Sequence, residues 1–251
     1  MVERTGAVTT LVLNVPERKN AIGPTMVNEL LYALEDVAED DSQRVLILRG
    51  AGGCFCAGGD LKQLSGKHTE ELPPRGDYVD LLLAMQGFDK PVVAQVEGYA
   101  MGGGLGMVAC CHLAVGAQSA ILGTPEIRRG LFPMMILAVL RPLMPPRKLT
   151  QMALLGEKLS AAEAAEVGLL TEVVPDVDLA ERVRSLAEQL AKLSPVALSM
   201  GLAAMLETRG MPMAEALPNL RARLFTLLGT EDAQEGLRAF FEKREPVFKG
   251  R

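Results

Sequence analysis

The first half of the chain alternates short, apolar, β-branched runs with amphipathic stretches. Residues 7–15, 44–50 and 91–98 are mostly apolar runs of strand length, so each predicts a strand. From Pro24 onward, apolar residues recur near the helical period and share one face, which predicts an amphipathic helix. The pattern is typical of repeated strand and helix units.

Other segments of the first half continue this alternation. Residues 65–77 are polar, contain two prolines and show no periodicity, so we expect an exposed loop, followed by a helix over residues 78–86. Downstream, the sequence MGGGLG (101–106) leads into an apolar helix, and residues 112–117 and 120–124 predict two short strands. The recurring order is strand, glycine-rich turn and helix.

Helix signals dominate after residue 145. Only residues 168–174 predict a strand in this part of the chain. A capping-box signature begins at Ser160, and Ser194 and Thr230 carry side chains suited to helix N-caps. The last third of the chain therefore predicts a helical layer.

This helical layer suggests two regions in the chain. We expect a core with the active site over residues 1–190 and a helical oligomerisation region over residues 191–251. The layer contains more apolar residues than a thin helical cap could bury against itself. Contacts between subunits would explain them, and so would packing on the core of the same chain.

Composition narrows the class of protein. With 49% hydrophobic and 23% charged residues among 251, the chain has ordinary globular usage, which excludes a disordered chain or a fibre. A net charge of −5 with scattered Lys and Arg disfavours nucleic acid as a partner. No apolar run approaches the roughly 20 residues of a membrane span, and the N-terminus lacks a signal-peptide pattern. We expect a soluble, cytoplasmic protein with no membrane partner.

The cysteines do not suggest a metal site. They occur as two close pairs, at positions 54 and 56 and at positions 110 and 111, which does not fit a secreted disulfide framework. A zinc site would need histidines at ligand spacing or a CxxC motif, and the chain has two histidines and no such motif. We expect reduced cysteines and no bound metal.

Two glycine turns could bind an anion. The Gly-Gly pair at 58–59 and the three glycines at 102–104 each follow a predicted strand. Glycine lets the backbone approach a ligand, and the start of a helix presents free N–H groups, so two such turns aimed at one point would form an oxyanion hole. Glycines that only permit tight turns are the alternative. A dinucleotide site is disfavoured because the GxGxxG-like start at residue 50 has Phe55 at its last glycine position.

Six motifs together resemble one known family. They are PERKNA (16–21), FCAGGDLK (55–62), PVVA (91–94), GYAMGGG (98–104), TPEI (124–127) and FFEKR (240–244). Their order and intervals closely resemble the crotonase (enoyl-CoA hydratase/isomerase) superfamily, over essentially the whole chain. The resemblance implies an α/β fold: a crotonase-like spiral of repeated ββα units with a C-terminal helical trimerisation region. It also implies an acyl-CoA thioester substrate, assembly as a homotrimer or a dimer of trimers, and no cofactor, coenzyme A being part of the substrate.

The resemblance assigns binding residues. The backbone N–H groups of Gly59 and Gly103 match the donors that stabilise the thioester enolate. The coenzyme A path matches Ala57, Asp60, Leu61 and Lys62. For Asp60 the alternative is a helix N-cap, and for Lys62 a solvated surface charge.

The acyl group has a second set of candidates. The residues expected to line its pocket are Met101, Leu105, Gly106 and Met134. Met134 and Met135 stand where hydratases of the family have a glycine-rich continuation, so they would crowd the water site or fill the core.

The resemblance also exposes a departure in the catalytic residues. Hydratases of this family use two glutamates that orient a water; the second matches Glu126, and the first falls at Gly106, which cannot act as an acid or base. We therefore favour an isomerase in which Glu126 moves a proton between C2 and C4 of an enoyl-CoA. Glu126 could instead be a stabilising acid in a first helical turn. The open alternatives are a hydratase with another water anchor, a non-catalytic acyl-CoA-binding subunit, and thioester hydrolysis or decarboxylation.

Overall fold

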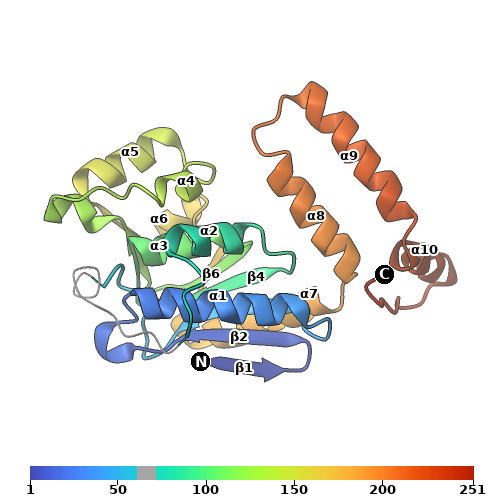
Figure 1. Cartoon of the computed structure of the whole chain (residues 1–251), viewed down its shortest axis with the longest axis horizontal. Coiled ribbons are helices and arrows are strands. Elements are labelled where there is room, and N and C mark those ends of the chain that lie inside the picture. Colours follow the sequence, from blue (N-terminus) through green and yellow to red (C-terminus); the bar gives the residue numbers. More distant parts are fainter. Residues whose placement is uncertain (61–71) are drawn as a thin grey trace.

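A mostly parallel sheet forms the centre of the protein (Figure 1). The computed structural model describes residues 1–60 and 72–251, and within them this sheet has six strands in the order β1-β2-β3-β4-β6-β9. The strands are β1 (Val2–Thr5), β2 (Val8–Leu13), β3 (Val45–Gly50), β4 (Val92–Val96), β6 (Leu113–Ala117) and β9 (Glu172–Val174). Only β1 pairs antiparallel, with β2. A parallel sheet needs both faces covered, which agrees with the near-continuous burial of β3 and β4.

A small second sheet supports the site. It consists of β5 (Tyr99–Met101), β7 (Ile121–Gly123) and β8 (Lys158–Ser160), with β5 parallel to β7 and β8 antiparallel to β7. Strand β5 follows β4 after a turn at Gly98 and leads directly into the next helix. The glycine-rich turn therefore joins the small sheet to α3.

Helices pack on the central sheet and on one another. Helix α7 (Leu179–Ala191) lies across β2, β3, β4 and β6, while α1 (Pro24–Glu39) contacts β2 and α2 (Tyr78–Gln86). Helix α2 also contacts α3 (Gly103–Cys110), which begins at the glycine turn. The other short helical segments are η1 (Pro16–Arg18), η2 (Pro125–Arg129), α4 (Leu137–Leu140), α5 (Pro146–Leu155), α6 (Ala161–Glu166) and η3 (Asp176–Asp178).

Most of the predicted elements are present. The strands expected at 7–15, 44–50 and 91–98 and the helices expected from Pro24 and over 78–86 are confirmed, each within a few residues. The strand expected at 168–174 is wrong in its first half: Gly168 has a φ of +86°, and the chain pairs with β6 only from Glu172. Of the predicted loop 65–77, residues 65–71 lie outside the described part, and the rest is neither helix nor strand before α2.

The three predicted caps are also confirmed. Ser160 and Glu163 form a reciprocal capping box at the start of α6. The Ser194 and Thr230 side chains accept hydrogen bonds from backbone N–H groups at the starts of α8 (Pro195–Glu207) and α10 (Glu231–Glu242). These side chains satisfy N–H groups that would otherwise lack an acceptor.

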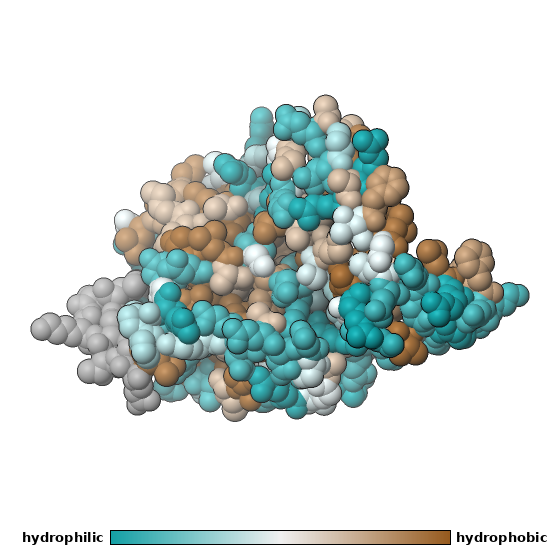
Figure 2. All heavy atoms as spheres, turned by 45° about the vertical axis from the view of Figure 1, so that its right-hand side comes forward, coloured by the Kyte–Doolittle hydropathy of each residue, from teal (hydrophilic) through white to brown (hydrophobic). Residues whose placement is uncertain are grey.

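Helices α8, α9 (Met213–Leu228) and α10 extend away from the central sheet, with α8 and α9 side by side (Figure 1). Figure 2 shows apolar side chains gathered along the edge of these helices. The large exposed ones are Met205, Met213, Leu217, Leu220, Leu224, Phe225, Leu228, Leu237, Phe240 and Phe241. Packing on the core of the same chain therefore does not explain them. The boundary at residues 190 and 191 stays a prediction.

The cysteines, the possible metal ligands and the helices bear on the partners that the sequence raised. All four cysteines are free thiols. Within residues 1–60 and 72–251 no group of three His, Cys, Asp or Glu side chains could hold a metal ion. In the same residues no single helix is long and apolar enough to cross a membrane. One pair of helical segments, Asp176–Ala191 and Pro195–Glu207, would be long and apolar enough together, by length and composition only, and the two are bent by 103° relative to each other.

Candidate active site

The first helical turn of α3 presents a row of backbone donors. Gly102, just before the helix, has φ +50° and ψ −121°, a conformation that glycine adopts without a steric penalty. Its own N–H donates to Gly123 O at 2.9 Å, which fixes the turn to β7. The first regular bond of the helix runs from Gly106 N to Gly102 O at 3.0 Å. The N–H groups of Gly103, Gly104 and Leu105 are therefore left without an intrahelical acceptor.

A second donor comes from the segment beside β5. Ile22 N donates to Gly58 O at 2.8 Å, and Asp60 N donates to Ile22 O at 2.7 Å. In this parallel bridge the N–H of Gly59 points away from Ile22, and Gly59 is exposed. Within residues 1–60 and 72–251 no group accepts from the Gly59 N–H, so this donor can face a ligand.

The two donor segments lie against each other. Cys56 N donates to Tyr99 O at 2.8 Å, and Met101 N donates to Cys56 O at 2.9 Å. A Cβ on Gly104 would stand 2.7 Å from the Cβ of Cys56, so only glycine permits this approach of α3 to the segment. The segments that carry Gly59 and Gly103 are therefore neighbours, as the sequence predicted for a shared site.

Glu126 faces the same turn. It lies in η2 and is half-buried, and a Cβ on Gly102 would stand 2.7 Å from its Oε1. Its Oε2 is buried and has no hydrogen-bond partner among the described residues. Thr124 does not cap η2, because its hydroxyl donates to Met152 O at 3.1 Å. Glu126 is thus turned toward the start of α3, with its Oε2 unpartnered among the described residues.

The surroundings of Glu126 suit proton transfer. Burial raises the pKa of its carboxyl above the usual value of 4.5, and the positive charge of Arg129 partly opposes that rise. A raised pKa brings a carboxylate closer to the pH at which it can both take and return a proton.

Tyr78, which the sequence analysis did not identify, completes this wall of the site. Its hydroxyl donates to Gly103 O at 2.6 Å. Burial raises the pKa of the phenol strongly, and the negative charge of Glu126 adds to that rise, so the hydroxyl stays neutral. A Cβ on Gly106 would clash with the Tyr78 Oη and stand 2.5 Å from Ile136 Cγ2.

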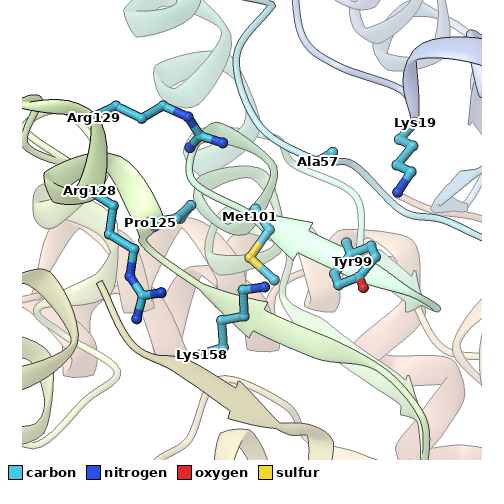
Figure 3. Close-up of a pocket in the computed structure, with 8 residues that line it drawn as sticks. All are labelled: Lys19, Ala57, Tyr99, Met101, Pro125, Arg128, Arg129 and Lys158. Atoms are coloured by element: carbon cyan, nitrogen blue, oxygen red, sulfur yellow. The ribbon is translucent and has the colours of Figure 1, made fainter. Parts of the chain in front are cut away.

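A basic pocket of about 510 Å³ adjoins the glycine turn (Figure 3). Four cationic side chains line it: Lys19, Arg128, Arg129 and Lys158. The Nζ atoms of Lys19 and Lys158 lie 5.2 and 5.7 Å from the centre of the Tyr99 ring, one on each side of it in Figure 3. Cations around an aromatic ring suit a ligand that carries phosphates and a flat ring.

The chain as a whole is similar to known acyl-CoA enzymes. Residues 3–251 match the family model described as enoyl-CoA hydratase/isomerase. The chain belongs to this family. The 2,3-dehydroadipyl-CoA hydratase of Escherichia coli is 34% identical over 100% of this chain and 98% of its own. An enoyl-CoA hydratase of Mycobacterium tuberculosis is 35% identical over 100% and 96%.

Solved structures of the enoyl-CoA hydratase/isomerase family share this fold. The crystal structure of enoyl-CoA hydratase from Bacillus anthracis has a TM-score of 0.93 at 30% identity, covering 100% of this chain and 99% of that one. The enoyl-CoA hydratase of Mycobacterium smegmatis has a TM-score of 0.92 at 30% identity, covering 99% and 98%. The expected crotonase-like α/β fold is confirmed, and the chain is an enzyme of the enoyl-CoA hydratase/isomerase family.

The residues expected on the coenzyme A path of this enzyme do not all line the basic pocket. Ala57 is exposed and lines the basic pocket. Asp60 is buried and its Oδ2 lies 2.5 Å from Arg18 Nη1, so its carboxylate helps to hold the donor segment. Leu61 and Lys62 lie outside the described residues.

The residues expected around the acyl group differ in how deeply they are buried. Met101 is buried and lines the pocket, and Leu105 is fully buried in the core. Met134 and Met135 are 69% and 52% exposed. The side chain of that segment that packs over Gly106 is Ile136, which is 3% exposed and was not identified from the sequence. Its position next to the two methionines was the only available signal.

Proposed function

We propose that this enzyme converts 3-enoyl-CoA thioesters into 2-enoyl-CoA thioesters with Glu126 as the single proton carrier. The observation that carries the proposal is the pairing of a half-buried Glu126 carboxylate, whose Oε2 has no partner among the described residues, with a position 106 that has no side chain. Moving a double bond needs one group that takes a proton and returns it elsewhere, whereas adding water needs the water to be held as well.

The reaction has two proton transfers. The Glu126 carboxylate removes a proton from C2, and the electron pair delocalises over C2, C3 and C4 and the thioester oxygen as a dienolate. The N–H groups of Gly59 and Gly103 donate to that oxygen, where the negative charge develops. Glu126 then returns the proton to C4, which leaves the double bond between C2 and C3. No group is gained or lost, and Glu126 ends ionised as it began.

Binding of the coenzyme A moiety is part of the proposal. The cations of the basic pocket suit its phosphates, and the pocket adjoins Ala57 and Met101, next to the donor segments. Coenzyme A enters and leaves as part of the substrate, so no separate cofactor is proposed. The apolar side chains exposed on α8, α9 and α10 support assembly as a homotrimer or a dimer of trimers. The cytoplasmic location expected from the sequence stays a prediction.

A second candidate is hydration of 2-enoyl-CoA. It is favoured by the names of the relatives, since those from E. coli and M. tuberculosis are both called hydratases. This candidate requires a water anchor other than position 106.

One experiment separates the candidates. The purified protein is incubated separately with a 3-enoyl-CoA and a 2-enoyl-CoA, while the absorbance of the conjugated thioester is followed and products are identified by mass. Conversion of the 3-enoyl form without hydration of the 2-enoyl form is the expected result. A Glu126→Ala variant should lose this conversion and still bind the thioester. Hydration of the 2-enoyl form as the main reaction would overturn the isomerase proposal.

A further inference from the structure

Position 106 in this enzyme is filled by its neighbours. Gly106 is buried in α3, directly after the three residues with free N–H groups. The Tyr78 hydroxyl and the Ile136 Cγ2 both occupy the space that a Cβ would need. No side chain fits there unless α3, Tyr78 or Ile136 moves, because atoms in a packed interior have little room to shift.

Tyr78 is held firmly in this place. It is the first residue of α2, and the Asp77 carboxylate caps that helix by accepting from Val79 N and Asp80 N, while Asp80 bonds back to Asp77 N at 2.7 Å. At its other end the Tyr78 hydroxyl donates to Gly103 O at 2.6 Å. Both ends of the side chain are thereby fixed.

Ile136 closes the remaining side. It immediately precedes α4, which packs against α3, and its side chain is 3% exposed. The wall of the site around Gly106 therefore consists of a neutral phenol, whose proton is already donated to Gly103 O, and an aliphatic side chain. Such a wall has no negative charge that could take a proton from a water.

We infer that Tyr78 and Ile136 determine reaction specificity by closing the water site at Gly106. Hydration would bond the oxygen of a water to C3 and place a proton on C2, and that water needs a place and a proton acceptor. Tyr78 and Ile136 take the place, and the absent side chain of residue 106 removes the acceptor. The inference rests on the isomerase function proposed above and identifies which residues select it.

The packing part is tested without any substrate. Gly106→Ala in the wild-type protein should lower the melting temperature by about 5 °C, the effect of overpacking a well-filled site in a chain of this size. In a Tyr78→Phe/Ile136→Ala background the same substitution should cost less than half as much. Equal costs in the two backgrounds would overturn the inference, whatever the enzyme catalyses.

The chemical part uses the ratio of two rates. In a Gly106→Glu/Tyr78→Phe/Ile136→Ala variant, hydration of a 2-enoyl-CoA relative to isomerisation of a 3-enoyl-CoA should rise at least tenfold over the Tyr78→Phe/Ile136→Ala variant. Tyr32→Phe is the matched control: it removes a phenol hydroxyl that donates to Pro73 O on the surface, and it should leave the ratio as it is.

The possible outcomes are distinct. If the wild type isomerises but the ratio of hydration to isomerisation does not rise in the triple variant, the inference is wrong and the proposed isomerase function is unaffected. Wild-type protein that mainly hydrates contradicts both. If the triple variant does not fold, the inference is decided by the melting temperatures of Gly106→Ala in the wild type and in the Tyr78→Phe/Ile136→Ala background.

Discussion

Replacing Glu126 with glutamine is expected to remove activity and to stabilise the fold at neutral pH. Glutamine keeps the shape of the side chain but cannot take a proton. The Oε2 atom has no hydrogen-bond partner among the described residues, so the substitution breaks no described bond at that oxygen. Loss of a positioned general base costs about 10²- to 10⁴-fold in rate, which is the expected fall in kcat.

The gain in stability follows from the raised pKa of Glu126. Because the folded-state pKa lies above the unfolded value, the folded protein binds the proton more tightly, and ionisation of Glu126 costs folding free energy. That cost is absent below the unfolded pKa and develops as the pH rises through the folded pKa. Glu126 is half-buried, so solvent screens part of this cost. The cost at neutral pH is then roughly 1 kcal/mol or less, which corresponds to about 2–4 °C in melting temperature.

Two assays check this pair of effects. Conversion of a 3-enoyl-CoA is followed across pH for the wild type, whose kcat/KM should fall on the acid side through a pKa above 4.5. Melting temperatures of the wild type and Glu126→Gln are compared at neutral pH and near pH 4, where the difference should shrink. Glu166→Gln, on the exposed surface of α6, is the control and should change neither quantity. Activity within tenfold of wild type, or a glutamine variant that melts earlier at neutral pH, would refute the reasoning.

Three further predictions concern the donors, the basic pocket and the helical region. Gly103→Pro removes an N–H at the first position of α3, where proline is tolerated, and should lower kcat 10²- to 10³-fold more than Gly103→Ala, which keeps that N–H. Lys158→Ala should raise KM for the CoA thioester roughly 3- to 10-fold and weaken its salt dependence, while Lys192→Ala, away from the pocket, should not; steady-state kinetics at two ionic strengths measure both. Phe241 is 78% exposed, and Phe241→Glu should reduce the assembly to smaller species in size-exclusion chromatography with light scattering.

The elements that sequence patterns predicted are those fixed by local interactions. The capping box at Ser160 and the N-caps at Ser194 and Thr230 depend on residues within one helical turn, so the sequence contains all of their information. The buried strands and the α1 face likewise depend on a periodicity that is read within one element.

The elements that were missed depend on distant partners. Strands β5 and β8 have three residues each, too few for a periodicity, and both exist because they pair with β7. Strand β1 is exposed along its length and is defined by its pairing with β2. For the candidate site, the motifs pointed to Glu126 and the two glycine turns. The packing of Tyr78 on Gly106 joins α2 to α3, which are separated in the chain by strands β4 and β5, and it could not be read from either helix.

That contact changes what the glycine at position 106 means. From the sequence, Gly106 is a lost carboxylate, and restoring glutamate there would be expected to restore a water anchor. In the structure the space is already occupied by the Tyr78 hydroxyl and Ile136, so Gly106→Glu alone adds a side chain that has no room and should destabilise the protein before it affects water. On the inference above, the reaction type then depends on three positions in contact. It follows that a glutamate or glycine at this position in a related sequence indicates hydration or isomerisation only when the residues that face it are considered with it.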